Sequence, residues 1–377
     1  MKQLLKNAIF GIGLIIFSNA NGQKLISEMI NKNISEMVNK NVSDANKIAS
    51  AYSGPALGAM GNNLNNGWYS TADPLKLGRF KLELNIPLSF PSESEKNFKV
   101  NEIGLYSMKT NTNEAPTAFG SRNESATFYV VEDLLGKTDT IKNFTLSGGG
   151  LPLMPMINPQ LNVGLVFGTE LMFRYLPSID SRGFKTNYWG LGVKHDIKQW
   201  IPIIKQLPFS LSFIGAFSNL DATYTFADAI LPIANATTPF VDLSGKELID
   251  KPSFNDQKVM IAINSWNANV IISKKLPFVS FFGGLRLSHT STSLSLEGNF
   301  PLQTFDIRET AISNTNFGKP ANTYLKNPLS SSYNKTSFGI NGGTRIKLGI
   351  ISILLDGTYV PGGFSSATAG FGIGFFN

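Results

Sequence analysis

The segment Phe80–Phe90, FKLELNIPLSF, is the clearest indication of the fold class. Every even position is apolar and every odd position is polar or proline, so the two faces of an extended chain here differ in chemistry. Its eleven residues match the roughly 9–11 that a tilted strand needs to cross a bilayer. We predict that the even-numbered side chains meet lipid and that the odd-numbered ones point into a lumen.

The same alternation recurs along the rest of the chain. It is visible at 161–167, 171–175, 189–193, 209–213, 259–263, 279–287, 338–340, 346–348, 353–359 and 371–375. These repeats predict an all-β fold, a transmembrane antiparallel β-barrel. Allowing roughly 20–25 residues for each strand and its connection gives 12–14 strands, and fourteen is our predicted number. The alternative is a soluble β-sandwich whose aromatic residues form its core.

The connections between these stretches differ in length. Lys205–Phe209 and Lys274–Phe278 are similar short segments, and we interpret both as periplasmic turns. The longer polar stretches at 108–126, 218–256 and 297–335 are predicted to be extracellular loops. An aromatic girdle at the membrane boundary is expected from Tyr175, Trp200, Phe209 and Phe278.

The chain begins with the features of a secretory signal peptide. Lys2 and Lys6 precede the apolar run Ala8–Phe17, and small residues follow it up to Gly22. The run is too short for a membrane-spanning helix. We therefore expect residues 1–22 to be a signal peptide cleaved near Gly22, and the mature protein to reside in the outer membrane.

Residues 23–76 are predicted to form a separate N-terminal unit, with the barrel at 77–377. Apolar residues spaced three and four apart over 24–50 predict an amphipathic helix. The Gly- and Asn-rich segment 53–69 is expected to be irregular and to lie inside the barrel as a hatch. A periplasmic linker is the alternative. Six residues are the hatch candidates: Leu57, Met60, Asn62, Leu64, Trp68 and Tyr69.

Composition removes several classes of function. Only 16% of the 377 residues are charged, and there is no cysteine. Thiolate metal sites and a disulfide scaffold are thereby excluded. The net charge of +7 is dispersed along the chain, so we expect no nucleic-acid partner.

Several blocks resemble an uncharacterised family of outer-membrane β-barrel proteins, known only as a domain of unknown function. They are Gly61–Tyr69, Ala115–Gly120, Gly168–Pro177 and Trp189–His195. This resemblance implies a barrel in the cell envelope and no particular substrate. A hatch followed by about fourteen strands is also similar in architecture to the long-chain fatty-acid transporter family.

The chain end carries a further expectation. Phe371, Ile373 and Phe375 alternate with glycines, and Asn377 stands where outer-membrane proteins usually have an aromatic residue. This final strand resembles the signal that the barrel-insertion machinery recognises. Outer-membrane lipid and that machinery are therefore the expected partners.

The predicted lumen is rich in basic residues. Alternation directs seven charged side chains inward, because charge on the lipid face costs about 2–4 kcal/mol at the bilayer midplane: Lys81, Glu83, Arg174, Lys194, Arg286, Arg345 and Lys347. They are candidates for lining an anion-attracting passage or binding a ligand. Alternatively they pair with acidic residues such as Glu28, Glu36 and Asp73 and fill a plugged interior.

No enzymatic chemistry is expected. His195 and His289 are the only histidines, and no nucleophile elbow, zinc-binding or phosphate-binding motif occurs. We expect no cofactor and no metal. The sequence favours a passive transporter or channel for small, hydrophobic or amphipathic solutes. The alternative is a non-transporting envelope scaffold or adhesin-like barrel that acts through its loops.

Overall fold

The computed structural model describes residues 38–134, 137–181, 183–232, 240, 248–305 and 320–375. The expected signal peptide, residues 1–22, and residues 24–37 of the expected amphipathic helix lie outside these ranges. Within the described ranges, the elements are one helix, three 3₁₀ turns and eighteen strands. In chain order they are α3 (Val38–Leu64), β1 (Phe80–Phe90), η1 (Glu93–Glu95), β2 (Asn97–Lys99), η2 (Val100–Glu102), β3 (Met108–Thr110), β4 (Glu114–Pro116), β5 (Ser125–Leu134), β6 (Lys137–Ser147), β7 (Met154–Pro155), β8 (Asn158–Gly164), β9 (Thr169–Ser181), β10 (Phe184–Asp196), η3 (Lys198–Trp200), β11 (Ser210–Thr225), β12 (Lys258–Lys275), β13 (Val279–Glu297), β14 (Asn299–Phe305), β15 (Pro320–Lys326), β16 (Leu329–Leu348), β17 (Ile351–Tyr359) and β18 (Ser365–Gly374).

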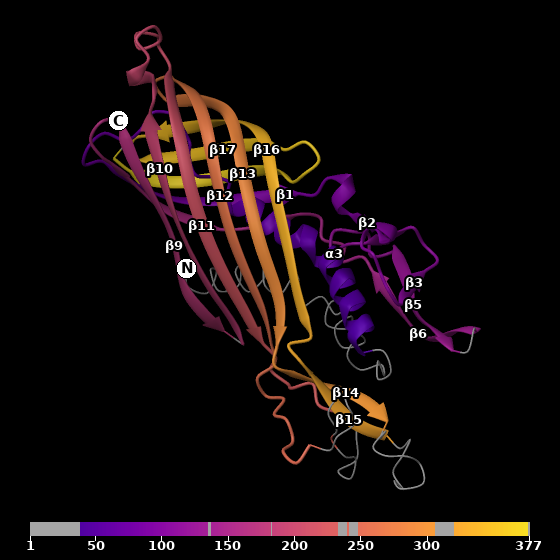
Figure 1. Cartoon of the computed structure of the whole chain (residues 1–377). Helices are drawn as coiled ribbons and strands as arrows, with labels where there is room; N and C mark the ends of the chain where they lie inside the picture. Colours follow the sequence, from indigo (N-terminus) through magenta and orange to yellow (C-terminus); the bar gives the residue numbers. More distant parts are fainter. Residues whose placement is uncertain are drawn as a thin grey trace, which may run out of the picture.

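The strands close into an antiparallel barrel (Figure 1). The order around the ring is β1-β8-β9-β10-β11-β12-β13-β16-β17-β18, and β18 pairs back onto β1 from Lys81↔Gly374 to Phe90↔Ser365. The short β7 continues β8 along the same edge of β1. The predicted fold class, a transmembrane antiparallel β-barrel, is confirmed.

The predicted number of fourteen strands is wrong, because the ring has ten. Two features of the chain account for the difference. β11, β12, β13 and β16 are 16–20 residues long, well beyond what a bilayer crossing needs. In addition, β2–β6 and β14–β15 form small sheets outside the ring.

The first strand has the two faces that its sequence predicts. Lys81, Glu83, Asn85 and Ser89 are buried toward the lumen, whereas Leu82 is 57% exposed on the outside. Phe80, Leu84, Ile86 and Phe90 share the outer face with Leu82. In a membrane this outer face meets lipid tails.

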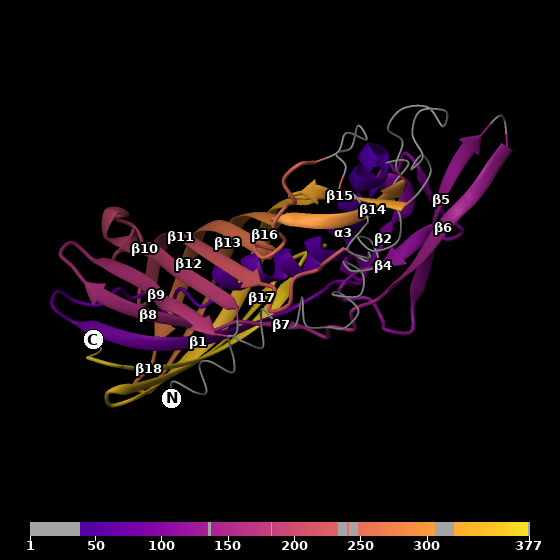
Figure 2. The same cartoon turned by 90° about the horizontal axis from the view of Figure 1, so that it is seen from below.

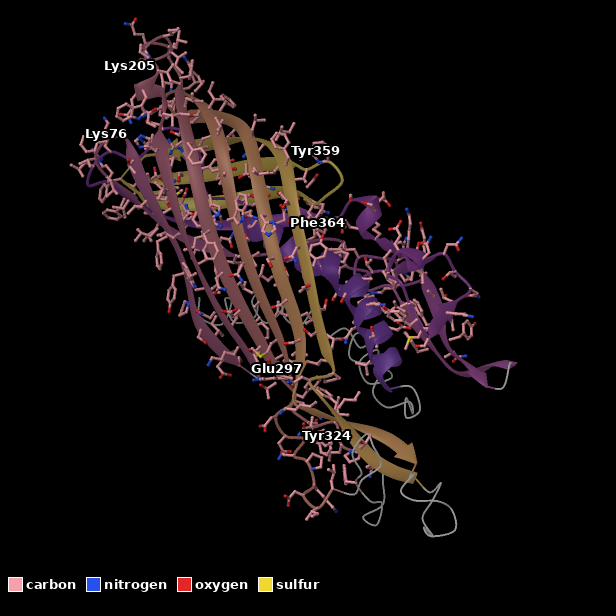
Figure 3. The ribbon with its side chains drawn as sticks, in the orientation of Figure 1. Lys76, Lys205, Glu297, Tyr324, Tyr359 and Phe364 are labelled. Carbon is pink, nitrogen blue, oxygen red and sulfur yellow. The ribbon has the colours of Figure 1, made fainter. Side chains whose placement is uncertain are left out.

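The two ends of the barrel differ. At the short-turn end, residues 165–168, 197–209, 276–278 and 349–350 join neighbouring strands. At the long-connection end, residues 91–157, 226–257 and 298–328 leave the ring and return. Lys76 and Lys205 mark the first end, and Glu297 and Tyr324 mark the second (Figure 3). The predicted loops at 218–256 and 297–335 are shorter than expected, since β11 continues to Thr225 and β16 begins at Leu329.

The outward side chains divide the barrel into two levels. An outer aromatic belt, composed of Tyr175, Trp189, Phe217, Trp266, Phe338 and Tyr359, is exposed around the ring. An inner belt near the short turns contains Phe80, Trp200, Phe278, Phe281 and Phe375. We call the wall between these belts the membrane band, and the strand ends beyond the outer belt the outer section. Of the predicted girdle residues, Tyr175 belongs to the outer belt and Trp200 and Phe278 to the inner one, whereas Phe209 is half-buried with the Lys198 ammonium over its ring.

Polarity reverses where the strands pass the outer belt. In the membrane band of β13, Leu285 and Leu287 face outward and Arg286 faces inward. In the outer section of the same strand, Ser293 faces outward, whereas Leu294 and Leu296 are buried inside. β12 changes in the same way, from buried Asn267 and Asn269 to buried Ile261 and Ile263. The outer section is therefore built like a water-soluble protein with an apolar core.

Helix α3 lies partly in this core and partly in the lumen. Figure 2 shows it running from inside the barrel toward β2–β6. Its buried residues Ile48, Tyr52, Ala56, Leu57 and Met60 belong to one cluster with the apolar residues of the outer section. Among the described residues, no helix is long and apolar enough to cross a membrane.

The expectation that 53–69 is irregular is wrong for most of the segment, because α3 continues to Leu64. The glycines serve close packing. A Cβ atom at Gly54 would lie 2.9 Å from Tyr333, one at Gly58 2.6 Å from Tyr333, and one at Gly61 2.0 Å from Thr290. These three residues form a bare stripe on the helix that lets it approach β16 and β13. Enclosure by the barrel thus stabilises a helix that glycine content alone disfavours.

Candidate functional site: a plugged lumen

The lumen of the membrane band holds the predicted charged residues together with residues 62–75, which we call the plug. Lys81, Glu83, Arg174, Lys194, Arg286 and Arg345 are all buried and inward-facing, and Lys347 is half-buried toward the short-turn end. Each of the predicted hatch residues, Leu57, Met60, Asn62, Leu64, Trp68 and Tyr69, is also buried. The structure therefore brings six of the seven charged candidates and the hatch candidates into one interior.

Asparagines of the plug make hydrogen bonds to the barrel and its rim. The Asn62 amide donates to the Ser89 hydroxyl (2.8 Å), and the Asn63 amide donates to the carbonyl of Met154 (2.7 Å). The Asn65 side-chain oxygen accepts from Ser265 (2.9 Å) and Asn267 (3.0 Å). From the wall, Asn85 donates to the carbonyl of Gly67 (2.7 Å) and Gln160 to that of Trp68 (3.1 Å). The Gly- and Asn-rich composition thus supplies donors and acceptors at the places where the wall is polar.

Two buried arginines hold the centre of the plug. Arg174 donates to the carbonyls of Leu64 (3.0 Å) and Asn66 (2.8 Å), and its guanidinium lies 3.8 Å from the centre of the Trp68 ring. Arg286 donates to the side-chain oxygens of Asn62 (2.9 Å) and Asn66. Because α3 ends at Leu64, its last carbonyls need donors from elsewhere, and Arg174 supplies one.

Two ion pairs lie nearer the short-turn end. Lys81 lies 2.6 Å from Glu83, and Lys194 lies 2.8 Å from Glu170. Glu170 also accepts from the backbone N–H of Leu75 (2.8 Å), and the lysines reach Ser70 (3.2 Å) and the Thr71 carbonyl (3.4 Å). These charges therefore compensate one another, and they bind the part of the plug that lies nearest the short-turn end.

Glu170 is a residue that sequence analysis missed. Leu171, Phe173 and Tyr175 alternate outward, so the same pattern directs Glu170 inward next to Arg174. That signal was present in the sequence. Among the expected acidic partners, Asp73 lies in the plug, and Glu28 and Glu36 fall outside the described residues.

A carboxylate joins α3 to the chain between β1 and β8. Asp44 is fully buried and accepts from the backbone N–H groups of Tyr106, Ser107 and Met108 at 2.7–3.0 Å. The N–H of Ala118 also donates to the Tyr52 carbonyl (3.0 Å). One side of α3 thus packs on β12, β13 and β16, and the other side holds β2–β6.

The two histidines lie apart on the barrel surface. The His195 ring accepts from Trp200 Nε1 (2.9 Å) near the short turns, whereas His289 stacks on Trp266 in the outer belt and lies 2.8 Å from Thr336. Within the described part of the chain, no three His, Cys, Asp or Glu residues are grouped as a metal site would require. The absence of enzymatic activity stays a prediction.

Solved structures with a similar fold are barrels, and the similarity is weak. Ail, the attachment invasion locus protein of Yersinia pestis, has 10% identity and a TM-score of 0.24 over 79% of this chain and 97% of its own. The translocator domain of the autotransporter NalP from Neisseria meningitidis has 9% identity and a TM-score of 0.28 over 85% and 93%. The outer membrane transporter YddB from Escherichia coli has 10% identity and a TM-score of 0.27 over 76% and 39%. TM-scores this low say nothing about function.

Family membership is clear in contrast. No curated protein sequence matches the chain. The suggested similarity to the long-chain fatty-acid transporter family combined an N-terminal hatch with about fourteen strands, and the ring has ten strands. One family model matches residues 1–375, nearly the whole chain. The protein therefore belongs to the family of unknown function DUF6588.

Proposed function

We propose that this protein is an outer-membrane barrel with a closed lumen that presents a folded domain at the cell surface, as an envelope scaffold or an adhesin-like protein. The long-connection end would face outward, in keeping with the rule that outer-membrane barrels have short periplasmic turns. The presented domain consists of the outer section, the first half of α3, and β2–β6.

The observation that carries this proposal is the way in which two buried arginines hold the plug. Arg174 and Arg286 donate four hydrogen bonds to Leu64, Asn62 and Asn66. A hydrogen bond to a charged group contributes about 1.5–3 kcal/mol, and each 1.4 kcal/mol is a factor of about ten in population. A state with the plug displaced would therefore be rare, which disfavours passive conduction.

Planar-bilayer recording of the purified full-length protein tests the closed lumen. We expect no steady ion current from the wild type, and we expect uptake of small solutes to be unchanged in cells that lack the protein. A steady current, together with a loss of uptake on deletion, would instead support the transporter that the sequence favours.

Limited proteolysis of intact cells tests the surface domain. We expect cleavage within the connections of the long-connection end and none within the short turns until the outer membrane is permeabilised. Protection of those connections in intact cells would show that no domain is presented outside.

A further inference from the structure

The direction of α3 has a topological consequence. Asn46, in the first half of the helix, donates to the carbonyl of Pro328 (3.3 Å) and accepts from the N–H of Ser330 (3.2 Å), at the long-connection end. The helix ends at Leu64 against Arg174 in the membrane band. The chain then continues through the plug toward the short-turn end, where Leu75 lies beside Glu170. There the backbone N–H of Gly78 donates to the carbonyl of Gly164 (3.3 Å), just before β1 begins.

The polypeptide therefore runs through the closed ring from the long-connection end to the short-turn end before the first strand starts. The register from Lys81↔Gly374 to Phe90↔Ser365 closes the ring around it. A chain exported into the periplasm starts on the short-turn side of the membrane. Residues before the plug must consequently have moved outward through the ring, or been enclosed while it closed.

We propose that the barrel carries its own N-terminal segment across the outer membrane during assembly, so that the first half of α3 becomes part of the surface domain. This inference rests on the outward orientation proposed above. It adds a transport step whose cargo is a segment of this chain.

The surface domain needs that segment. Ile48 and Tyr52 are buried in its apolar core, and Asp44 accepts the backbone N–H groups that begin β3. Without α3, buried Ile261, Ile263 and Leu294 would lose their apolar cover. Folding of the domain outside the membrane thus provides a driving force for the outward movement, because apolar burial occurs only after the segment arrives.

The lumen limits what can pass. An eight-stranded barrel has an interior that is just filled by side chains. This ring of ten strands accommodates one helix, because Gly54, Gly58 and Gly61 place no side chain between the helix and the barrel wall. The segment would cross as an extended chain or a single helix, and a folded domain attached ahead of it would not fit.

Cysteine labelling tests the inference, and the chain has no native cysteine to interfere. Three full-length variants are compared in intact cells with a membrane-impermeant maleimide: Ser43→Cys on α3, Asn123→Cys in an exposed loop before β5, and Lys205→Cys in an exposed short turn. Heat-modifiable migration on gels confirms that each variant has folded. We expect Ser43→Cys and Asn123→Cys to be labelled in intact cells, and Lys205→Cys only after permeabilisation.

The possible outcomes separate the two proposals. Labelling of Asn123→Cys but not Ser43→Cys in intact cells would overturn the outward transfer of α3, while leaving the proposed orientation of the barrel and the surface position of β2–β6 in place. Labelling of Lys205→Cys alone would reverse the orientation and overturn both.

A fusion experiment tests the passage itself. A linear epitope of about ten residues is placed directly after the signal peptide, and in a matched variant it is replaced by a small disulfide-bonded domain. We expect the epitope to reach the surface and the disulfide-bonded domain to reduce folded barrel at least tenfold, with recovery under reducing conditions. Equal surface display of both fusions would contradict transfer through the lumen.

Discussion

The membrane band and the outer section consist of the same strands, yet the distribution of polar and apolar side chains between the outer and inner faces is reversed. Between the belts, β13 directs Leu285 to the outside and Arg286 to the lumen, and a few residues later it directs Ser293 outside and Leu294 inside. The surrounding medium explains the reversal. Lipid tails require an apolar exterior, so polar groups gather inside, whereas water permits the ordinary arrangement.

The two levels of the barrel interior bind the N-terminal segment through different interactions. In the membrane band the plug is held by hydrogen bonds and charges, as at Arg174 and Arg286. In the outer section α3 is held by apolar packing around Leu57 and Ile263. The two levels therefore differ in which substitutions disrupt them.

Substitution of the two buried arginines in the membrane band should destabilise the protein most. The double variant Arg174→Ala, Arg286→Ala removes four hydrogen bonds to the plug, each contributing about 1.5–3 kcal/mol, and should lower the free energy of unfolding by about 6–12 kcal/mol. We also expect ion current in planar bilayers. A control, Lys205→Ala in an exposed turn, should leave both unchanged. If the double variant carries no ion current, the arginines do not keep the lumen closed.

The next effect belongs to the core of the outer section. Leu294→Lys places an unpaired charge there and should destabilise by about 3–5 kcal/mol, measured by urea titration in lipid vesicles. Its neighbour supplies the control, since Ser293→Lys points outward and should stay within about 0.5 kcal/mol. Equal losses in both variants would contradict the reversal of polarity.

A smaller loss is expected on the lipid face. Leu285 is 52% exposed between the two belts, so Leu285→Lys should cost about 2–4 kcal/mol in a bilayer. The cost should shrink in detergent micelles, which adapt to the charge. If lysine is tolerated here as well as at Ser293, the membrane band has been placed at the wrong level.

The smallest effect concerns the contact between α3 and β2–β6. In Asp44→Asn the amide group replaces one acceptor oxygen, which should cost about 1–3 kcal/mol. We expect faster proteolysis within residues 91–157 and no change in bilayer current. Current from this variant would show that the two levels are coupled.

Sequence periodicity predicted much of the membrane band. Alternation at Phe80–Phe90 identified both faces of β1, and the same rule directed Arg174, Lys194, Arg286 and Arg345 inward. These predictions succeeded because lipid imposes one simple rule on each strand. The rule also applies to Glu170, which directly precedes the alternating residues Leu171, Phe173 and Tyr175 and is buried inside.

The outer section was not predictable in the same way. Its alternation continues with the opposite sense, so that Val259, Ile261 and Ile263 are buried inside although their pattern resembles that of the lipid-facing residues of β1. A period of two does not state which face meets which medium. The helix through Gly54 and Gly61 was missed because its stability comes from contacts with Tyr333 and Thr290, which lie far away in the sequence.

The bare stripe on α3 has an evolutionary consequence. Gly54 and Gly58 face Tyr333, Gly58 also faces Phe364 at the rim (Figure 3), and Gly61 faces Thr290. The calibre of the ring is fixed by its number of strands, so helix and wall share a constant width. In other members of the family, a larger residue at one of these glycines should coincide with a smaller one at its partner. Covariation of these residue pairs in the family would show that the diameter of the ring limits the combined size of the two side chains.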